Sequence, residues 1–330
     1  GSMGRNHLRV LGALPGAELC AISDPVPAAL ESAVAASGAR GYPDAERMLD
    51  EARLDAVVIA APTTFHLPLA MAAIGRGIAV LVEKPLAATP DEGLRLAIAA
   101  RDSGVPVQVG HIERFNPAVR ELTRLLAGGA LSSVYAITSR RAGPFPARIR
   151  DVGVTIDLAT HDADILCLVA GQRPVRVSAE TAQRIHAAHE DLLFGLLHFP
   201  GGAIGMLDVN WLTPAKRRTL VVLGEEGMFE LDYLTQRLTF TRAEATEVPT
   251  LIRGYAPTFE GDVADIPVDR QEPLAAELES FLRVVREGGR PEVDAEDGLW
   301  AVAITDALLR ASRSHTAVDL SGLAARLRLP

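Results

Sequence analysis

Short apolar segments alternate with helical patterns over the first 115 residues of the chain. The apolar segments end in turn-forming residues and lie at 17–22, 54–60, 77–82 and 105–109. Helical periodicity separates them at 5–14, 27–37, 45–52, 66–76 and 90–103. Strands this apolar that alternate with helices indicate a parallel sheet covered on both faces. We therefore predict an α/β fold that opens with a doubly wound domain over residues 1–115.

After residue 115 the pattern becomes rich in strands. A helix is expected at 117–126, followed by strands at 133–140, 175–183, 192–199, 203–211, 218–223, 228–232 and 238–241. The glycine-containing connections 200–202 and 225–227 join neighbouring strands as hairpins do. We expect an α+β domain over 116–330 with a largely antiparallel sheet, one face of which is covered by helices at 156–170, 274–286 and 295–313. The other face is open, which predicts a homodimer or homotetramer.

Composition narrows the functional classes. The 330 residues carry 33 basic and 42 acidic side chains, a net charge of −9, which disfavours binding to nucleic acid or to anionic membranes. No apolar segment reaches the roughly 18 residues of a membrane span, and the first residues do not form a signal peptide, so we expect a cytoplasmic protein. Cys20 and Cys167 lie in apolar segments without metal-ligand spacing, so we interpret both as buried and expect no metal site.

The first four residues, Gly1-Ser2-Met3-Gly4, match the end of a glycine-rich turn that places pyrophosphate at a helix N-terminus. In that interpretation all four belong to a cofactor site, and the strand before the turn is absent from the sequence. Alternatively, Gly1-Ser2 is left from cloning and Gly4 alone belongs to the turn. In either case we expect the doubly wound domain to lack its first strand and to bind cofactor weakly.

Asp24 stands at the end of the domain's second strand, about 20 residues after the glycine turn. A carboxylate there can accept hydrogen bonds from the adenosine ribose. This position predicts NAD as the cofactor, because a carboxylate there repels the 2′-phosphate of NADP. Asp24-Pro25 is also a common way to open a helix, and the sequence leaves that interpretation open.

Two further strand ends carry polar motifs at the sheet edge where such folds bind ligands, Pro62-Thr63-Thr64-Phe65-His66 and Glu83-Lys84-Pro85. Together with the features above, Arg114-Phe115-Asn116-Pro117 and the Asp157/His161 segment, they resemble the glucose–fructose oxidoreductase/inositol dehydrogenase/MocA (Gfo/Idh/MocA) family. The resemblance implies an N-terminal Rossmann domain, a C-terminal open-faced sheet, and nicotinamide-dependent oxidation or reduction of a sugar-like secondary alcohol. It places Lys84 between cofactor and substrate, with Thr63, Thr64 and His66 in the cofactor site. We interpret Glu83 as a group that either orients its neighbours or contacts the cofactor.

Lys84 is also unusual without the resemblance. Of the 33 basic residues only Lys84 and Lys216 are lysines, so the chain uses arginine for nearly every positive charge. A lysine retained in such a chain suggests a need for a compact donor or for a shifted pKa. The alternative is a surface lysine paired with Glu83.

Asp157 and His161 are four residues apart in a predicted helix, so they share one face. A carboxylate beside an imidazole fixes its tautomer and stabilises its protonated form. The resemblance implies that His161 is the base that takes the hydroxyl proton and that Asp157 assists it. A solvent-exposed ion pair is the alternative.

Basic residues around the catalytic segment suggest an anionic substrate. Arg140, Arg141, Arg148 and Arg150 flank residues 143–146, and Lys216 begins a second cluster. A solvated charged face is the alternative.

Residues 110–117 and 148–153 look most like the UDP-N-acetylglucosamine 3-dehydrogenase branch of the family. That likeness implies oxidation of the 3-hydroxyl, with Arg114, Asn116, Arg150 and Lys216 as substrate residues. An unactivated polyol such as inositol is an alternative substrate. A non-catalytic, dinucleotide-sensing regulator is an alternative function, and such a protein would be expected to lose Lys84 or His161. Other histidines, His7 among them, have no acidic partner at motif spacing, so no site role is assigned to them.

Overall fold

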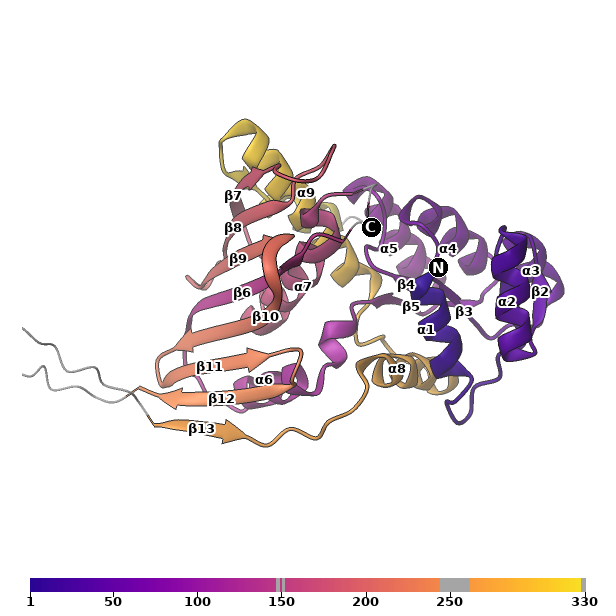
Figure 1. Cartoon of the computed structure of the whole chain (residues 1–330), viewed down its shortest axis with the longest axis horizontal. Helices are drawn as coiled ribbons and strands as arrows, with labels where there is room; N and C mark the ends of the chain where they lie inside the picture. The colour runs from indigo at the N-terminus through magenta and orange to yellow at the C-terminus, as the bar shows by residue number, and fades with distance from the viewer. Residues whose placement is uncertain (147–148, 150–151, 244–261, 328–330) are drawn as a thin grey trace, which may run out of the picture. The chain divides into compact units, whose positions relative to one another are not determined.

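The computed structural model describes residues 1–146, 149, 152–243 and 262–327, and its chain divides into two compact units (Figure 1). The first unit contains Gly1–Phe115, Gln271–Arg310 and the segment from Leu320 on. The second contains Asn116–Arg270 and Ala311–Asp319. The change near residue 115 agrees with the sequence pattern, but the expected second domain of 116–330 is divided, because residues 271–310 return to the first unit.

The first unit alternates strands and helices. Its strands are β1 Ala21–Ser23, β2 Arg40–Tyr42, β3 Ala56–Ile59, β4 Ala79–Glu83 and β5 Val107–Gly110. Its helices are α1 Ser2–Leu11, α2 Pro27–Ser37, α3 Ala45–Glu51, α4 His66–Ile74, α5 Pro90–Ser103, α8 Pro273–Glu287, most of α9 Ala295–Ser314, and α10 Ser321–Leu327, with 3-10 turns η1 Thr63–Phe65 and η2 Ile112–Phe115.

The parallel strands of the first unit form two separate sheets. β1 pairs with β2, while β3, β4 and β5 pair in that order, all in parallel. One strand inserted between β1 and β3 would give the strand order of a doubly wound nucleotide-binding fold. The predicted parallel architecture is therefore confirmed, and the pairing is interrupted where the sequence predicted that a strand is lacking.

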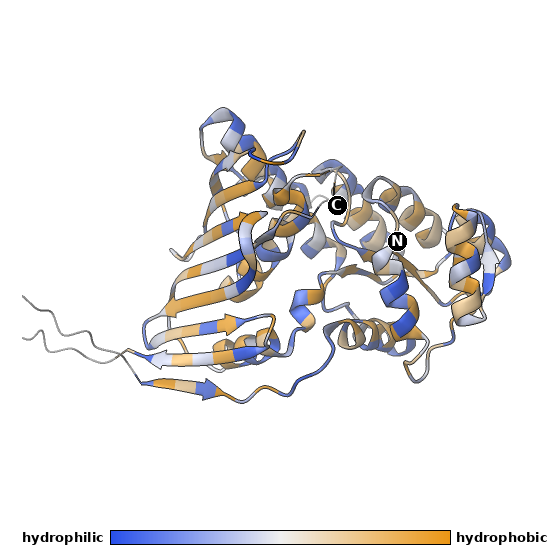
Figure 2. Cartoon of the chain, in the orientation of Figure 1, coloured by the Kyte–Doolittle hydropathy of each residue, from blue (hydrophilic) through white to orange (hydrophobic). Residues whose placement is uncertain are grey.

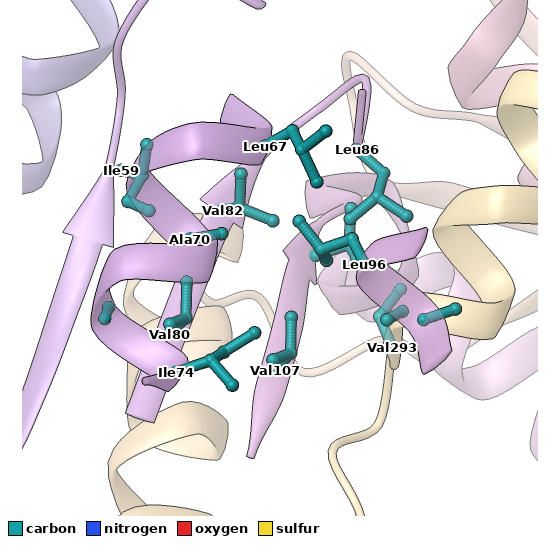
Figure 3. Close-up of a cluster of buried hydrophobic side chains, with 14 of the residues drawn as sticks. Ile59, Leu67, Ala70, Ile74, Val80, Val82, Leu86, Leu96, Val107 and Val293 are labelled. Carbon is teal, nitrogen blue, oxygen red and sulfur yellow. The ribbon is translucent and has the colours of Figure 1, made fainter. Parts of the chain in front are cut away.

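Both faces of the three-stranded sheet are covered. Figure 3 shows Val80 and Val82 of β4 beside Ala70 and Ile74 of α4, within a cluster that also contains Leu96 of α5. On the other side, Leu81 of β4 packs in a second cluster with Val10 of α1, with Leu14 just after that helix, and with three residues of α8, Leu274, Leu278 and Phe281. The prediction that α8 covers the second sheet was wrong, because its apolar stripe completes the core of the first unit.

The second unit contains a nine-stranded sheet. Its strands are β6 Val134–Pro144, β7 Arg176–Ala182, β8 Leu192–His198, β9 Ile204–Asn210, β10 Leu212–Gly224, β11 Gly227–Asp232, β12 Arg237–Arg242, β13 Val263–Ile266 and β14 Val318–Asp319. The strand order is β13-β12-β11-β10-β6-β9-β8-β7-β14, and only the pair β6 and β9 is parallel. The largely antiparallel sheet is therefore confirmed, although β13 and β14 were not predicted.

One face of this sheet is covered and the other is open. Helix α7 Thr160–Ala170 packs on β6, and α6 Pro117–Ala127 packs on β11 and β12. Along β8 and β9 buried and exposed residues alternate. Figure 2 shows that hydrophobic residues predominate along β8. Phe194, Leu196, Ile204 and Met206 are 40–51% exposed. The second unit therefore presents an apolar surface on its open face.

Two further expectations concern individual features. Cys167 is buried as predicted, but Cys20 is exposed just before β1, so its interpretation as a buried residue was wrong. Among the described residues, none of the helices combines the length and the apolar character that crossing a bilayer requires.

Candidate active site

The predicted pyrophosphate turn forms the N-terminus of α1. Gly1 is the N-cap and has no side chain to cap the helix, and the first turn contains no acidic residue. A Cβ on Gly4 would lie 4.0 Å from Cβ of Ala60, which places this helix start at the end of β3. Uncapped N–H groups and the helix dipole favour an anion at this position. The residues present therefore fit the pyrophosphate of a dinucleotide.

Asp24 follows β1 directly. Its backbone N–H donates to the carbonyl of Tyr42, and its Oδ1 accepts the N–H of Val26 at 2.9 Å. The carboxylate thus closes the turn before α2, which agrees with the interpretation of Asp24-Pro25 as a helix start. Its second oxygen, Oδ2, takes no part in this turn. Both interpretations are compatible with the structure, and selection of NAD by Asp24 stays a prediction.

His66 joins the threonine loop to the strand end that carries Lys84. Its Nε2 lies 2.9 Å from the carbonyl oxygen of Ala61, and its Nδ1 lies 2.8 Å from that of Pro85. The residue is 1% exposed. Because both ring nitrogens contact the backbone, the structure gives His66 a bracing role, and its contact with the cofactor stays a prediction. Thr63 and Thr64 lie in η1, where Thr64 is exposed.

Glu83 and Lys84 stand at the carboxyl end of β4. Glu83 is buried, and its Oε1 lies 2.7 Å from Nε2 of His7. Its Oε2 accepts the backbone N–H of Lys84 at 3.2 Å. Lys84 itself is half-buried. The Glu83 carboxylate therefore orients its neighbour's backbone, which is one of the two roles considered for it.

The segment that contains Asp157 and His161 differs from the regular helix that was predicted over 156–170. Thr155–Ala159 forms a π-helical turn, η3, and α7 begins only at Thr160. Such turns are rare and frequently occur at functional sites. Asp157 lies in the π turn and His161 in the first turn of α7, and both are half-buried. An imidazole in this position can act as a proton acceptor, with a carboxylate on the preceding turn.

Glu190 holds the start of the π turn. Its Oε1 accepts the N–H of Thr155 at 3.1 Å, and its carbonyl accepts the N–H of Val154 at 3.0 Å. A Cβ on Gly153 would meet the Glu190 carboxylate, so the glycine leaves the space in which this side chain lies. Sequence reasoning missed Glu190, since 35 residues separate it from Thr155.

Asp162 anchors the same helix to the sheet and is completely buried. Its oxygens accept from Ser139 Oγ at 2.7 Å and from Arg141 Nε at 2.8 Å. Arg141 is itself 2% exposed, so its inclusion in an anion-binding cluster was wrong. Within the described ranges, no group of three or more His, Cys, Asp or Glu residues could hold a metal ion.

Two predicted substrate residues have structural contacts. Arg114 donates to Asp297 Oδ2 at 3.0 Å and to the carbonyl of Glu292 at 3.2 Å. Asn116 is 2% exposed, caps α6 by accepting the N–H of Ala118, and donates to the carbonyl of Tyr233. These contacts explain both residues without a substrate, whose binding to them stays a prediction.

Lys216 and Arg150 are the other two predicted substrate residues. Lys216 is exposed in an irregular stretch of β10, with its stem beside Gly143. Arg150, like Arg148, lies outside the described residues.

Comparison with known proteins decides the family. Residues 1–111 match the model of an oxidoreductase family with an NAD-binding Rossmann fold, and residues 119–230 match the GFO/IDH/MocA C-terminal domain. The chain belongs to the Gfo/Idh/MocA family. It is an NAD-dependent oxidoreductase that acts on a CH–OH group, which confirms the predictions of family, cofactor and reaction class.

Individual members differ in substrate. The chain is 32% identical over 320 residues to inositol 2-dehydrogenase 2 of Saccharopolyspora erythraea, which covers 94% of this chain and 90% of the relative. The structure of UDP-N-acetylglucosamine 3-dehydrogenase from Acidithiobacillus ferrooxidans is similar with a TM-score of 0.84, 24% identity and 95% coverage of each chain. The structure of the WlbA dehydrogenase from Bordetella pertussis, in complex with NADH and UDP-GlcNAcA, is similar with a TM-score of 0.83 and 25% identity. The match covers 97% of this chain and 95% of that chain.

Proposed function

We propose that this Gfo/Idh/MocA oxidoreductase oxidises a secondary hydroxyl of a nucleotide sugar to a ketone, with UDP-N-acetylglucosamine and its 3-hydroxyl as the first candidate. The observation that carries the oxidation step is the presence of two proton-handling groups: Lys84 at the end of β4 and His161 at the start of α7, preceded by Asp157. A dinucleotide-sensing regulator would not need to keep both.

Each residue has a separate task in this proposal. His161 takes the hydroxyl proton, and Asp157 stabilises the imidazolium that forms. Lys84 donates a hydrogen bond to the hydroxyl oxygen, which orients the carbon that is oxidised. NAD, when bound, accepts the hydride from that carbon. The products are a ketone, NADH and one proton held by His161, so atoms and charge balance.

The nucleotide-sugar assignment rests on two observations. The WlbA dehydrogenase, which covers nearly the whole chain, was solved with UDP-GlcNAcA. In addition, Lys216 is an exposed cation on an irregular part of β10, in a chain of net charge −9. An exposed ammonium suits a diphosphate.

Inositol is a second candidate substrate, favoured by the 32% identity to an inositol 2-dehydrogenase. It carries no phosphate, so a substrate site for it would not need Lys216.

The test measures NADH formation with NAD and a panel of UDP-N-acetylglucosamine, UDP-GlcNAcA, myo-inositol and scyllo-inositol. We expect turnover with a UDP-sugar, and we expect Lys216→Glu to raise KM for it roughly tenfold or more. Turnover of inositol alone, with KM indifferent to Lys216→Glu, would select the second candidate.

We also propose that a second copy of the chain covers the open face of the nine-stranded sheet. Leu196 of β8 lies opposite Met206 of β9, and both are at least 40% exposed. Met206→Glu should lower the mass measured by light scattering while NADH binding is retained. The cytoplasmic location, and the absence of nucleic-acid and membrane partners, stay predictions.

A further inference from the structure

A buried histidine that no sequence motif singled out contacts the strand end that carries Lys84. His7 is 3% exposed and lies on the same side of α1 as Val10, the other buried residue of that helix. Its Nε2 lies 2.7 Å from Glu83 Oε1, across a separation of 76 residues. The side chains are 3% and 9% exposed, so water hardly screens this pair.

The second oxygen of the Glu83 carboxylate, Oε2, contacts the backbone of the next residue. Oε2 accepts the N–H of Lys84 at 3.2 Å. A Cβ on Gly110, at the end of β5, would lie 3.0 Å from this oxygen and 3.1 Å from the Glu83 Cα. The glycine therefore leaves the space in which the carboxylate folds back. Glu83 connects His7 on one side with the backbone of Lys84 on the other.

A second buried carboxyl group, that of Glu277, interacts electrostatically with Glu83. Glu277 of α8 is completely buried, and neither of its oxygens has a hydrogen-bond partner among the described residues. Burial, and secondarily the charge of Glu83, raise the pKa of Glu277 well above the ordinary carboxyl value. Glu277 therefore keeps its proton to higher pH than an ordinary carboxyl group does. In its protonated form it adds no second negative charge beside Glu83.

We propose that His7 is a positioning residue for Lys84. By donating Nε2–H to Glu83 it fixes the carboxylate that holds the Lys84 backbone, and it links Lys84 to the helix whose N-terminus receives the cofactor pyrophosphate. Binding at the start of α1 and the orientation of the lysine are thereby coupled through one buried hydrogen bond. The inference rests on the proposed function only for the role of Lys84.

The composition of the chain allows a direct measurement. With lysine labelled by ¹³C at Cε and ¹⁵N at Nζ, the protein has two side-chain signals, and Lys216→Arg assigns the one from Lys84. His7→Leu removes the donor, and His7→Gln retains an N–H. Val10→Ala is the control, since it weakens the packing of the same helix without touching Glu83.

We expect His7→Leu to shift the Lys84 signal and to lower kcat roughly tenfold to a hundredfold, with the Kd for NADH changed less than about threefold. Compared with His7→Leu, His7→Gln should show a smaller shift of the Lys84 signal and a smaller loss of kcat. Val10→Ala should lower the Tm but leave the Lys84 signal in place. If His7→Leu does not fold, His7→Ala against Val10→Ala decides, because alanine also removes the donor.

A Lys84 signal equally unmoved in the His7 variants and in Val10→Ala would overturn the inference. The signal is read without substrate, so this result is independent of the substrate assignment. Conversely, a shifted signal in an enzyme that oxidises no sugar of the panel would contradict the proposed function and leave the positioning role of His7 supported.

Discussion

The two sheets of this chain bury their residues in different ways. In β4 all five residues are buried, and the strand becomes polar only at its end, at Glu83. In β8 and β9 exposed and buried residues alternate along the strand. A polar residue that ends a doubly covered strand is therefore conspicuous in the sequence, whereas one within a half-exposed strand is not. The candidate residues Glu83 and Lys84 of the first unit accordingly follow a strand end, whereas Asp157 and His161 of the second unit were predicted from their helical spacing and the family resemblance.

The largest expected effect is the loss of turnover when Lys84 of the first unit or His161 of the second is replaced. Lys84→Ala or His161→Ala should lower kcat roughly 10²- to 10⁴-fold, because both act in the chemical step, with NADH affinity changed only a few-fold. Stopped-flow turnover and NADH titration measure the two quantities. His161→Ala should also lose the acidic limb of the pH profile of kcat/KM, since neutral imidazole is the active form. Near-normal turnover and an unchanged profile would show that another base acts.

The interruption between β1 and β3 predicts the next largest effect. A strand of about ten residues that ends in a glycine turn, fused before Gly1, should pair with both and make one sheet of two. We expect NADH to bind roughly tenfold tighter or more, and the Tm to rise by several degrees, by calorimetry. The matched control carries proline in the middle of the added strand, where it removes a ladder hydrogen bond. Equal affinity for the two fusions would contradict the interpretation of the interruption.

A smaller effect is expected from Asp24, which follows strand β1 of the two-stranded sheet. The protein should bind NADH at least about tenfold tighter than NADPH, and Asp24→Ala should narrow that ratio. Asp24→Asn is the control for the turn, because its amide oxygen can still accept the N–H of Val26. A ratio near one in the unmutated protein would remove Asp24 from the cofactor site.

The smallest effect concerns Glu277. Its pKa is raised in the folded state, so the folded protein holds a proton that the unfolded chain releases above the ordinary carboxyl pKa. Its contribution to stability is present below that pKa and is lost as pH rises towards the raised value. Glu277→Gln cannot titrate, so its Tm advantage should grow by a few degrees between about pH 5 and about pH 8. A constant difference would show that Glu277 ionises normally.

The fold was predictable wherever local chemistry marks an element. Helices α2 and α5 have the predicted bounds, because each begins at a proline and ends before a glycine of positive φ, Gly38 or Gly104. Strand β2 was missed because Arg40–Tyr42 has only three residues and no apolar run. The π turn was missed because its hydrogen-bond pattern leaves no trace in hydropathy.

The candidate site was predictable where its residues follow a strand end, as Glu83 and Lys84 do, or were expected to share one helical face, as Asp157 and His161 were. Arg141 was misjudged because its partner Asp162 is 21 residues away, and a buried ion pair cannot be distinguished from a surface cluster by spacing. His7 was passed over for the same reason, although its spacing to Val10 on one face of α1 was a signal of burial.

The return of α8 to the first unit has a consequence for synthesis of the chain. Leu278 and Phe281 complete the core around Leu81, yet they follow the strands of the nine-stranded sheet from β6 to β13 in the sequence. A ribosome therefore synthesises eight of the nine strands of that sheet, all but β14, before the cofactor-binding unit has all of its parts. Folding of the N-terminal half during translation has to wait for the C-terminal half, the reverse of the usual N-terminal-first order.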